Sequence, residues 1–359
     1  MKERLYPTHD EGHLSLFRRL LLDWFDQYGR TLPWRGIDDP YRIWVSEIIL
    51  QQTQVVQGWD YYKRFIEAYP DVVALANARD EDVLFLWEGL GYYSRAHNML
   101  AAARQIVAQH GGSFPRNEKE VSALKGIGPY TTAAIMSIAY NYPLAVVDGN
   151  VYRVLSRVDA TEVPIDTTQG QKYYSALAAE YLDGTQPGKY NQAMMDLGAM
   201  ICTPRAPKCQ ECPIGSLCNS KGNRELIELL PIKSKKLVVD NRYLDYFLLL
   251  DGDNFWIEQR DKRGIWKGLY QFPLIESTEH TMSEEEIQEH LKGKWRLQKT
   301  FDLKPHRLTH RLLHIRIHLC YTIEATPLPS PYLSMPLSKH PTLAFPKPLR
   351  QFLDHHFQY

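Results

Sequence analysis

The spacing of apolar residues changes once along this chain, and the change predicts two domains of different fold class. From Leu14 to about Leu230, apolar side chains recur at helical spacing between Gly, Pro and Asp turns, as in "DVLFLWEGLGYYSRAHNMLAAARQIV". After the proline and lysine run of "LLPIKSKKLVVDN", the period falls to two in "RYLDYFLLL", a turn at "DGDN" and "FWIEQR". These patterns predict an all-α domain over residues 1–225, a linker over 226–240 and a second domain over 241–359.

The second domain mixes strands with a helix. In "HIRIHLCYTI" the polar residues His314, Arg316 and His318 alternate with apolar ones, which predicts a strand. The segment "SEEEIQEHL" predicts a helix that opens with a capping box of Ser283 and Glu286. We therefore expect an α+β fold here.

Composition indicates an ordinary globular protein. The chain is 44% hydrophobic and 23% charged, with 42 Lys and Arg against 42 Asp and Glu. Because the bulk charge is balanced, any nucleic-acid binding has to come from a local basic face. The first residues are polar and the longest apolar stretches, such as "YFLLL", are too short to span a bilayer. We expect no targeting or membrane segment, and a location in the cytoplasm.

Four of the five cysteines crowd into "CTPRAPKCQECPIGSLC", with the spacing C-x6-C-x2-C-x5-C. Four thiolates this close can converge on one metal centre, whereas disulfides are unexpected in a reducing cytoplasm. A zinc knuckle pair usually shows two C-x2-C units and this loop has one, so an iron–sulfur cluster is favoured over zinc and over unligated cysteines. The predicted ligands are Cys202, Cys209, Cys212 and Cys218, while Cys320 is expected to be a buried apolar residue.

The stretch "LKGIGPYTTAAI" predicts a glycine-rich turn followed by a helix. Gly126 and Gly128 let the backbone approach another group closely, and the helix starts by about Thr131. Bare amides at a helix start form an anion site, and phosphate is the obvious anion. The alternative is an ordinary corner between two helices.

Two carboxylates lie in settings that suit chemistry on a glycosidic bond. Asp39 and Pro40 begin the helix "DPYRIWVSEIILQQTQV", on which Glu47 has apolar neighbours that should raise its pKa toward that of a general acid. Asp148 ends an apolar run in "LAVVDGNVYRVLSR", where a helix starts. Cleavage of a glycosidic bond needs a proton donor and an anion beside the oxocarbenium ion. Taken alone, Glu47 also fits a solvated helix acid and Asp148 an N-cap.

Several motifs together resemble one family of DNA repair enzymes. The turn "LKGIGPY", the segment "VVDGNVYRV" and the four-cysteine loop, in that order and spacing, resemble the helix-hairpin-helix DNA glycosylases of the endonuclease III superfamily. Further segments are similar to the adenine DNA glycosylase (MutY) family nearly throughout the chain: "LPWR", "WVSEIILQQTQV", "EGLGYYSRAHN", "NQAMMDLGAMICTPRAPKC" and "GLYQFP".

The resemblance implies a fold, a cofactor and an activity. The fold would be a two-lobed helical glycosylase with DNA between the lobes, followed by a MutT-like (Nudix-fold) domain. The cofactor would be a 4Fe-4S cluster. The activity would be excision of adenine mispaired with 8-oxoguanine or guanine in double-stranded DNA. The resemblance further implies a monomeric bacterial enzyme that works in the cytoplasm on nucleoid DNA, without a membrane.

It also implies roles for particular residues. Glu47 matches the general acid that protonates the five-membered ring of adenine, and Asp148 matches the carboxylate that stabilises the sugar cation. Adenine has to be flipped out of the duplex, and another side chain has to fill the gap. Gln52 and Tyr92 match residues that wedge into the base stack. The adenine pocket matches Arg30, Trp34 and Arg35, with Leu50 and Asn150 as weaker matches; Trp34 and Tyr92 also fit core aromatics.

Tyr130 decides between two kinds of glycosylase. It stands where bifunctional relatives place a lysine, which attacks the sugar as a Schiff-base nucleophile and then nicks the strand. A phenol cannot do this, so we expect a monofunctional glycosylase in which Gly126 and Gly128 present amides to a DNA phosphate. The alternatives are a bifunctional lyase, a non-catalytic DNA-binding module, and a nucleotide hydrolase acting through the second domain.

The second domain departs from the family pattern in two places. The 8-oxoguanine-sensing loop is usually Phe-Ser-His, and the matching residues in "HRLTHRL" are Leu308, Thr309 and His310. Thr can replace Ser as hydroxyl donor, and Leu can replace Phe as an apolar wedge; ordinary strand or turn positions are the alternative. After "GLYQFP" no R-E-x-x-E-E helix follows, so the domain lacks ligands for the metal ions of pyrophosphate hydrolysis. We expect it to recognise the lesion.

Overall fold

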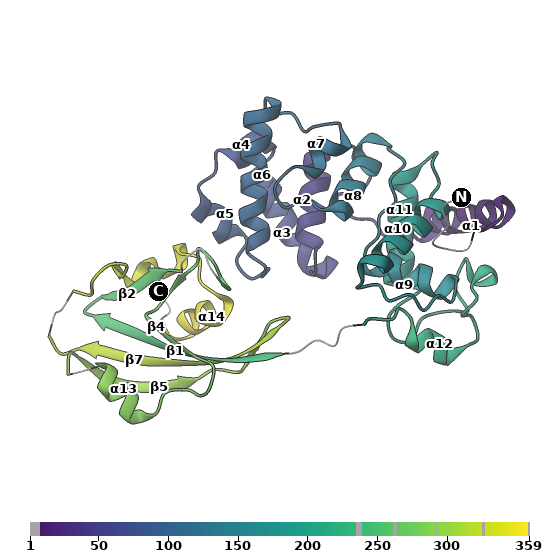
Figure 1. Cartoon of the computed structure of the whole chain (residues 1–359). Coiled ribbons are helices and arrows are strands. Elements are labelled where there is room, and N and C mark those ends of the chain that lie inside the picture. Colours follow the sequence, from purple (N-terminus) through teal and green to yellow (C-terminus); the bar gives the residue numbers. More distant parts are fainter. Residues whose placement is uncertain (1–7, 235–238, 261–263, 292, 325–326, 358–359) are drawn as a thin grey trace. The chain divides into compact units, whose positions relative to one another are not determined.

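The computed structural model describes residues 8–234, 239–260, 264–291, 293–324 and 327–357 (Figure 1). Residues 235–238 of the predicted linker lie outside the described residues. The backbone forms two compact units. One comprises residues 1–76 and 101–236, and the other comprises residues 77–100 and 237–359. Each unit is described by itself below.

The first unit is helical, as the apolar period predicts. Its elements are α1 (Glu11–Tyr28), α2 (Pro40–Leu50), α3 (Val55–Ala68), α4 (Val72–Ala76), the later part of α6 (Ser94–His110), α7 (Glu118–Ser122), α8 (Pro129–Tyr140), α9 (Gly149–Val158), α10 (Thr168–Tyr181), α11 (Pro187–Met200), the 3-10 turn η1 (Gly215–Leu217) and α12 (Arg224–Leu229). α2 packs on α3 and α8, whereas α1 and α9 pack on α11, and α10 packs on α1 and α9. α11 also contacts α8, so it joins the two groups.

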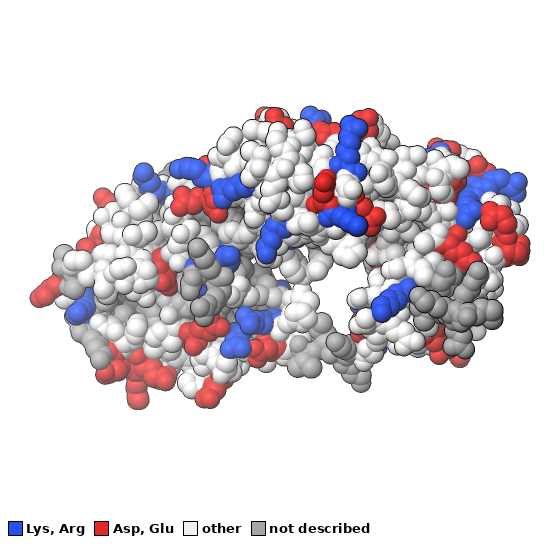
Figure 2. Space-filling view, turned by 45° about the horizontal axis from the view of Figure 1, so that its top comes forward, with Lys and Arg blue, Asp and Glu red and all other residues white. Residues whose placement is uncertain are grey.

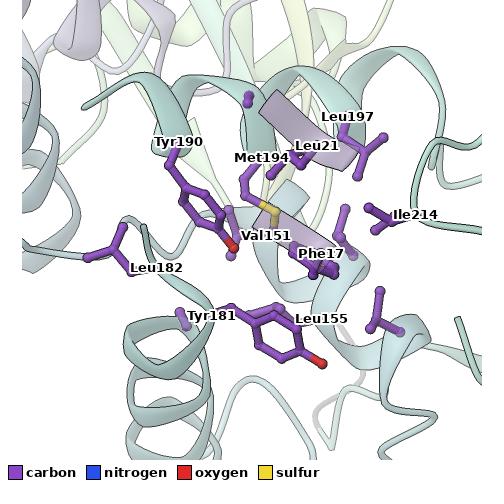
Figure 3. Close-up of a cluster of buried hydrophobic side chains, with 14 of the residues drawn as sticks. Phe17, Leu21, Val151, Leu155, Tyr181, Leu182, Tyr190, Met194, Leu197 and Ile214 are labelled. Carbon is purple, nitrogen blue, oxygen red and sulfur yellow. The ribbon is translucent and has the colours of Figure 1, made fainter. Parts of the chain in front are cut away.

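The largest described core of this unit surrounds α11 (Figure 3). Met194 and Leu197 of α11 meet Phe17 and Leu21 of α1 and Leu155 of α9 there, all nearly free of solvent. Along α11, Ala199 is the one described residue that is largely exposed. Burial of this apolar surface is what holds these helices in place.

The glycine-rich turn lies between α7 and α8, and its two glycines do different work. Gly126 has φ +77°, a left-handed conformation that residues with a Cβ rarely adopt. Gly128 has extended backbone (φ −96°) and is the N-cap of α8, where among the described residues no side chain caps the first amides. α8 begins at Pro129, two residues before the predicted start. The bare helix N-terminus expected from the sequence is therefore present.

The second unit contains a mixed sheet in the order β3-β2-β1-β7-β5, with β4 paired to β1, β6 to β7 and β8 to β2. Its strands are β1 (Asp240–Asp251), β2 (Asn254–Gln259), β3 (Tyr270–Gln271), β4 (Leu274–Ser277), β5 (Trp295–Asp302), β6 (His306–Arg307), β7 (Arg311–Thr322) and β8 (Leu333–Pro336). β1 and β7 run parallel, from the pair Asp240–Arg311 to the pair Leu250–Tyr321, while the other pairings are antiparallel. The helices are α13 (Glu284–Leu291) and α14 (Lys347–His356), with the 3-10 helix η2 (Leu337–Thr342).

Local signals predicted several of these elements correctly. The first strand, β1, begins at Asp240, and the "DGDN" turn separates β1 from β2. The capping box is formed: Ser283 Oγ accepts from Glu286 N at 3.2 Å, and Glu286 Oε2 accepts from Ser283 N at 2.6 Å. Cys320 is fully buried in β7, as expected.

Residues 77–100 belong by their contacts to the second unit, although they are helical. They comprise α5 (Asp80–Leu86) and the start of α6. Within this unit, Arg350 Nε of α14 donates to Glu88 Oε1 at 2.7 Å, and the backbone N–H of Phe345 donates to Glu88 Oε2 at 3.2 Å. The predicted boundaries treat residues 1–225 as one domain, whereas the backbone contacts group residues 77–100 with the second unit.

Two surface properties bear on function. Figure 2 shows Lys and Arg interspersed with Asp and Glu on the face in view, in keeping with the equal numbers of both charges. In the described part of the chain, none of the helices combines the length and the apolarity needed to cross a bilayer.

Candidate active site

α2 brings Glu47 into an apolar setting. Asp39 caps the helix, since its carboxylate accepts from Tyr41 N at 2.9 Å, and Pro40 follows at the first helical position, as predicted. Glu47 is only 7% exposed. Tyr130 of α8 donates its phenol hydrogen to Glu47 Oε2, with 2.5 Å between the oxygens.

The surroundings of Glu47 favour its protonated form up to about neutral pH. Burial raises the pKa of Glu47 to about 7 against the hydrogen bond from Tyr130, which lowers it. The charge of Asp148 raises the pKa further, and the charge of Arg35 lowers it. The alternative of a solvated helix acid is thereby excluded. Tyr130 is itself buried, and its pKa lies well above the usual value of a phenol, so it stays a neutral donor.

Asp148 is both the N-cap of α9 and a wall of the same cavity. Its Oδ1 accepts from Asn150 N at 2.9 Å and from Val151 N at 2.8 Å, and its Oδ2 accepts from Asn150 Nδ2 at 2.8 Å. Burial raises the pKa of Asp148 despite these bonds. The two interpretations offered for this residue are therefore compatible, because the cap fixes a carboxylate that also lines the pocket.

One pocket of about 360 Å³ joins these groups, a size typical of small-molecule sites. Eight of the residues singled out in the sequence line it: Arg30, Trp34, Arg35, Glu47, Leu50, Tyr130, Asp148 and Asn150. Trp34 is also buried, with its ring 5.2 Å from that of Tyr62, so it serves the core and the pocket together.

Sequence reasoning missed the contribution of α11. Gln192, Met195 and Ala199 line the pocket, three and four residues apart on one helix face. Leu32 and the start of α3 with its preceding turn, residues 53–56, line it as well. The signal that could have found α11 is the helical spacing of Gln192, Met195 and Ala199, which places these three residues on one face.

A buried arginine connects the pocket to the cysteine loop. Arg153 of α9 donates from Nη2 to Asn150 Oδ1 at 2.8 Å and to Gly198 O at 2.7 Å, and from Nε to Cys202 O at 2.6 Å. One guanidinium therefore fixes the amide beside Asp148, the end of α11 and the first predicted metal ligand.

The four predicted cysteine ligands line one cavity beside α9 and α12. Arg157 Nη1 lies 3.4 Å from Cys202 Sγ, a donor suited to a sulfur ligand. Burial first, and then the charges of the other three thiols, raise the pKa of Cys212 to about 12. A cationic metal centre would remove that penalty, so the donor set fits an iron–sulfur group. Among the described residues, no three His, Cys, Asp or Glu side chains are placed to share a single metal ion.

The two predicted wedge residues share an unusual backbone. Gln52 is exposed in the turn after α2 and has φ 59°. In the other unit, Tyr92 is 45% exposed between α5 and α6 and has φ 47°. Such left-handed backbone is uncommon for residues other than glycine and is concentrated at functional sites. Strain at both positions supports a functional role over a plain core role for Tyr92.

The predicted lesion loop is a tight turn between β6 and β7. Leu308 N donates to Arg311 O at 2.8 Å, and His310 O accepts from Asp240 N at 2.9 Å. Leu308 is half-buried, whereas Thr309 and His310 are exposed. The Thr309 hydroxyl hydrogen-bonds with the Tyr92 hydroxyl within the second unit. The loop is thus a turn in which Thr309 and His310 are both exposed and the Thr309 hydroxyl is bonded to Tyr92.

Comparison with known proteins agrees with this geometry. Residues 45–173 match the HhH-GPD superfamily base excision DNA repair proteins, residues 202–218 the iron–sulfur binding domain of endonuclease III, and residues 245–355 the NUDIX domain. The four cysteines therefore hold a 4Fe-4S cluster, as in that family, and zinc is set aside.

Relatives cover most of the chain. The adenine DNA glycosylase of Buchnera aphidicola subsp. Baizongia pistaciae is 37% identical over 72% of this chain and 73% of its own length. That of Buchnera aphidicola subsp. Acyrthosiphon pisum is 30% identical over 94% of this chain and 97% of its own. The chain spans only 44% of the length of the Mus musculus relative. Among solved structures, a thermostable thymine-DNA glycosylase superposes with a TM-score of 0.52 and 29% identity, covering 58% of this chain and 96% of that protein. The chain belongs to the adenine DNA glycosylases, within the HhH-GPD superfamily of base-excision repair proteins.

Proposed function

We propose that this chain removes adenine mispaired with 8-oxoguanine or guanine in duplex DNA and leaves an intact strand with an abasic site. The observation that carries the proposal is the single pocket in which Glu47, Tyr130 and Asp148 meet. A desolvated acid with a pKa of about 7 and a second carboxylate provide the two groups that cleavage of a glycosidic bond needs.

The chemistry follows from these two groups. Glu47 donates its proton to the five-membered ring of the flipped adenine, so that adenine leaves as a neutral base with the electrons of the N-glycosidic bond. Asp148 lies beside the resulting sugar cation and stabilises its positive charge. Water then forms a bond to the anomeric carbon and gives its proton to the Glu47 carboxylate, which restores the acid. The four cysteines of the loop would hold the iron–sulfur cluster, which would tie four points of the loop together.

A monofunctional reaction is proposed because the pocket offers a phenol at the place of a nucleophilic amine. The Tyr130 hydroxyl donates a hydrogen bond to Glu47, so it is engaged and not free to attack the sugar. The test is borohydride reduction during turnover. We expect release of adenine, no covalent protein–DNA adduct and no strand break without alkali. Efficient trapping would show that another amine acts and would contradict the proposal.

Recognition of 8-oxoguanine is proposed for the turn of Leu308, Thr309 and His310. An enzyme that removes a normal base has to take information from the opposite strand, and two exposed polar side chains on a fixed turn suit that task. Hydrogen bonds to the one added oxygen and one added ring N–H of 8-oxoguanine would supply roughly 1–3 kcal/mol of discrimination.

The decisive experiment measures adenine release under single-turnover conditions from duplexes with adenine opposite each normal base and opposite 8-oxoguanine. Thr309→Ala with His310→Ala should slow release opposite 8-oxoguanine more than release opposite guanine. Thr322→Ala, at the other end of β7, is the matched control and should leave the ratio unchanged. Equal losses on both substrates in a folded protein would remove this turn from lesion recognition.

A further inference from the structure

The loop that carries one wall of the pocket is anchored to α11 by a single carboxylate. Arg30 and Arg35 lie in the segment between α1 and α2, which forms neither helix nor strand. Asp196 of α11 accepts from Arg30 N at 3.0 Å and from Arg30 Nε at 2.8 Å. It also accepts from Arg35 Nη1 and Nη2, each at 2.7 Å. Both oxygens of Asp196 are thus used by two guanidinium groups.

This ion cluster is largely buried at the wall of the pocket. The side chain of Asp196 is 0% exposed, and that of Arg35 is 13% exposed. Burial raises the pKa of Asp196, but the hydrogen bonds from Arg35 and Arg30 outweigh it, so the pKa lies below its usual value and the carboxylate stays charged. Two cations and one anion leave one net positive charge at the pocket wall.

The position of Asp196 on α11 joins this cluster to the pocket. It follows Met195 directly and comes four residues after Gln192, and both of those line the pocket. The helix that forms one wall therefore also fixes the loop that forms another. A displacement of about 1 Å at such a site lowers a rate by about 100-fold.

We propose that Asp196 is a positioning residue for adenine release: it holds Arg30 and Arg35 at the pocket and balances part of their charge, and thereby sets the protonation of Glu47. The inference rests on the proposed role of Glu47 as the general acid. Asp196 does not line the pocket, but it would affect both the rate of adenine release and the pH dependence of that rate.

The direction of the pH effect follows from the groups that face Glu47. These are Tyr130 from α8, Asp148 from the N-terminus of α9, and Arg35 from the loop. Without the charge of Asp196, Arg35 still donates from Nη1 to Arg30 O at 2.7 Å and lies 5.1 Å from the centre of the Phe25 ring. It therefore stays near Glu47 but loses its counter-ion. The Glu47 carboxylate becomes easier to form, and the acid is lost at lower pH.

The experiment compares Asp196→Asn with Asp26→Asn. Asp26 of α1 pairs with Lys189 of α11 at 2.6 Å, and both side chains are more exposed than Asp196, so this ion pair on the same helix is the control. Single-turnover release of adenine opposite 8-oxoguanine is measured from pH 5 to 9, with binding of a duplex that carries an abasic analogue and with cluster absorbance. We expect Asp196→Asn to release adenine about 100-fold more slowly than the wild type. The alkaline limb of its pH–rate profile, where the rate falls as Glu47 ionises, should move down by about one pH unit. Duplex binding should be nearly unchanged. Asp26→Asn should match the wild type.

Two further variants test the inference if the Asp196→Asn protein does not fold. Asp196→Glu keeps the charge but is longer by one methylene, so it should slow release and leave the alkaline limb in place. In an Arg35→Gln background, Asp196→Asn should shift the limb no further. A wild-type rate for Asp196→Glu, or an unshifted limb in a folded Asp196→Asn protein, overturns the inference. Failure of the wild type to release adenine would instead refute the proposed function.

Discussion

Glu47 of the first unit and Asp245 of the second are both buried carboxylates, but their pKa values are shifted in opposite directions. Glu47 is 7% exposed and is bonded by a neutral phenol, and burial raises its pKa to about 7. Asp245 of β1 is 1% exposed, but Arg316 Nε, His318 Nε2 and the backbone N–H of Met282 each lie 2.9 Å from its oxygens. Burial would raise the pKa of Asp245, yet the bonds from His318, Met282 and Arg316 hold it below its usual value.

The difference shows that burial alone does not mark a functional acid. Asp245 is a satisfied anion inside a hydrogen-bonded network, where it ties β1 to β7 and to the start of α13. Glu47 lacks a cationic partner at bonding distance among its described contacts and borders a pocket. An acid that is costly to ionise is what a proton donor requires.

The largest expected effect is on the reaction rate and tests whether Glu47 is the acid of the comparison. Glu47→Gln keeps the shape of the side chain and removes its acidic proton, so single-turnover adenine release should fall about 1000-fold or more. Duplex binding and cluster absorbance should be retained. A rate close to that of the wild type would place Glu47 outside the reaction.

The second prediction concerns stability and tests whether Asp245 is a structural anion. Asp245→Ala leaves Arg316 and the buried His318 without their anion, and should lower the free energy of unfolding of the second unit by about 3 kcal/mol. Asp240→Ala is the control, since its pair with Arg242 at the start of the same strand is partly exposed, with Asp240 at 49%, and should contribute less than about 1 kcal/mol. Denaturant unfolding followed by tryptophan fluorescence measures both. Similar losses for the two variants would contradict the assignment of Asp245 as a buried structural ion.

The third prediction uses the opposite signs of the two pKa shifts. The folded-state pKa of Glu47 lies above its value of 4.5 in the unfolded chain, so its contribution to stability is full below pH 4.5 and is lost as the pH rises through about 7. Glu47→Gln should therefore be more stable than the wild type at pH 8, by up to about 3 kcal/mol, and equal to it at pH 4. For Asp245 the sign is reversed: its contribution is present above pH 3.8 and is lost as the pH falls through its folded-state pKa. Parallel pH dependences for the two sites would remove the distinction.

The smallest expected effect tests the hydrogen bond between Tyr130 and Glu47. Tyr130→Phe removes the hydrogen bond that favours the Glu47 carboxylate, so the pKa of Glu47 should rise and release should persist to higher pH. At pH 6 the rate should change by less than about tenfold. The pH profile of single-turnover release measures this. A limb that moves to lower pH would mean that Tyr130 acts on Glu47 in another way.

Much of the fold could be predicted because local signals agreed with it. The caps at Asp39 and Ser283, the change of apolar period near Asp240 and the compact cysteine loop each depend on neighbours a few residues apart. The apolar surroundings of Glu47 were visible for the same reason, since they lie on its own helix.

What could not be predicted depends on partners distant in the chain. Asp196 sits in an ordinary amphipathic pattern, and its bonds to Arg30 span 166 residues. His318 belongs to the alternating polar residues of β7, yet it is fully buried, because its Nε2 hydrogen-bonds with Asp245 of β1. Asp148 satisfies the rule for an N-cap, so nothing local separates a cap from a cap that also lines a pocket.

The burial of α11 has a consequence for mutational tolerance. Its 14 residues supply core contacts around Met194, the pocket wall at Gln192 and the anchor Asp196. At Gly198, a Cβ would come within 2.5 Å of the Cβ of Asn150. A saturation scan of this helix should find its buried and pocket-lining positions intolerant, for reasons that differ from one residue to the next. Sequence invariance along α11 would consequently carry little information about which residues touch adenine, and only assays that separate folding, cluster content and turnover can assign them.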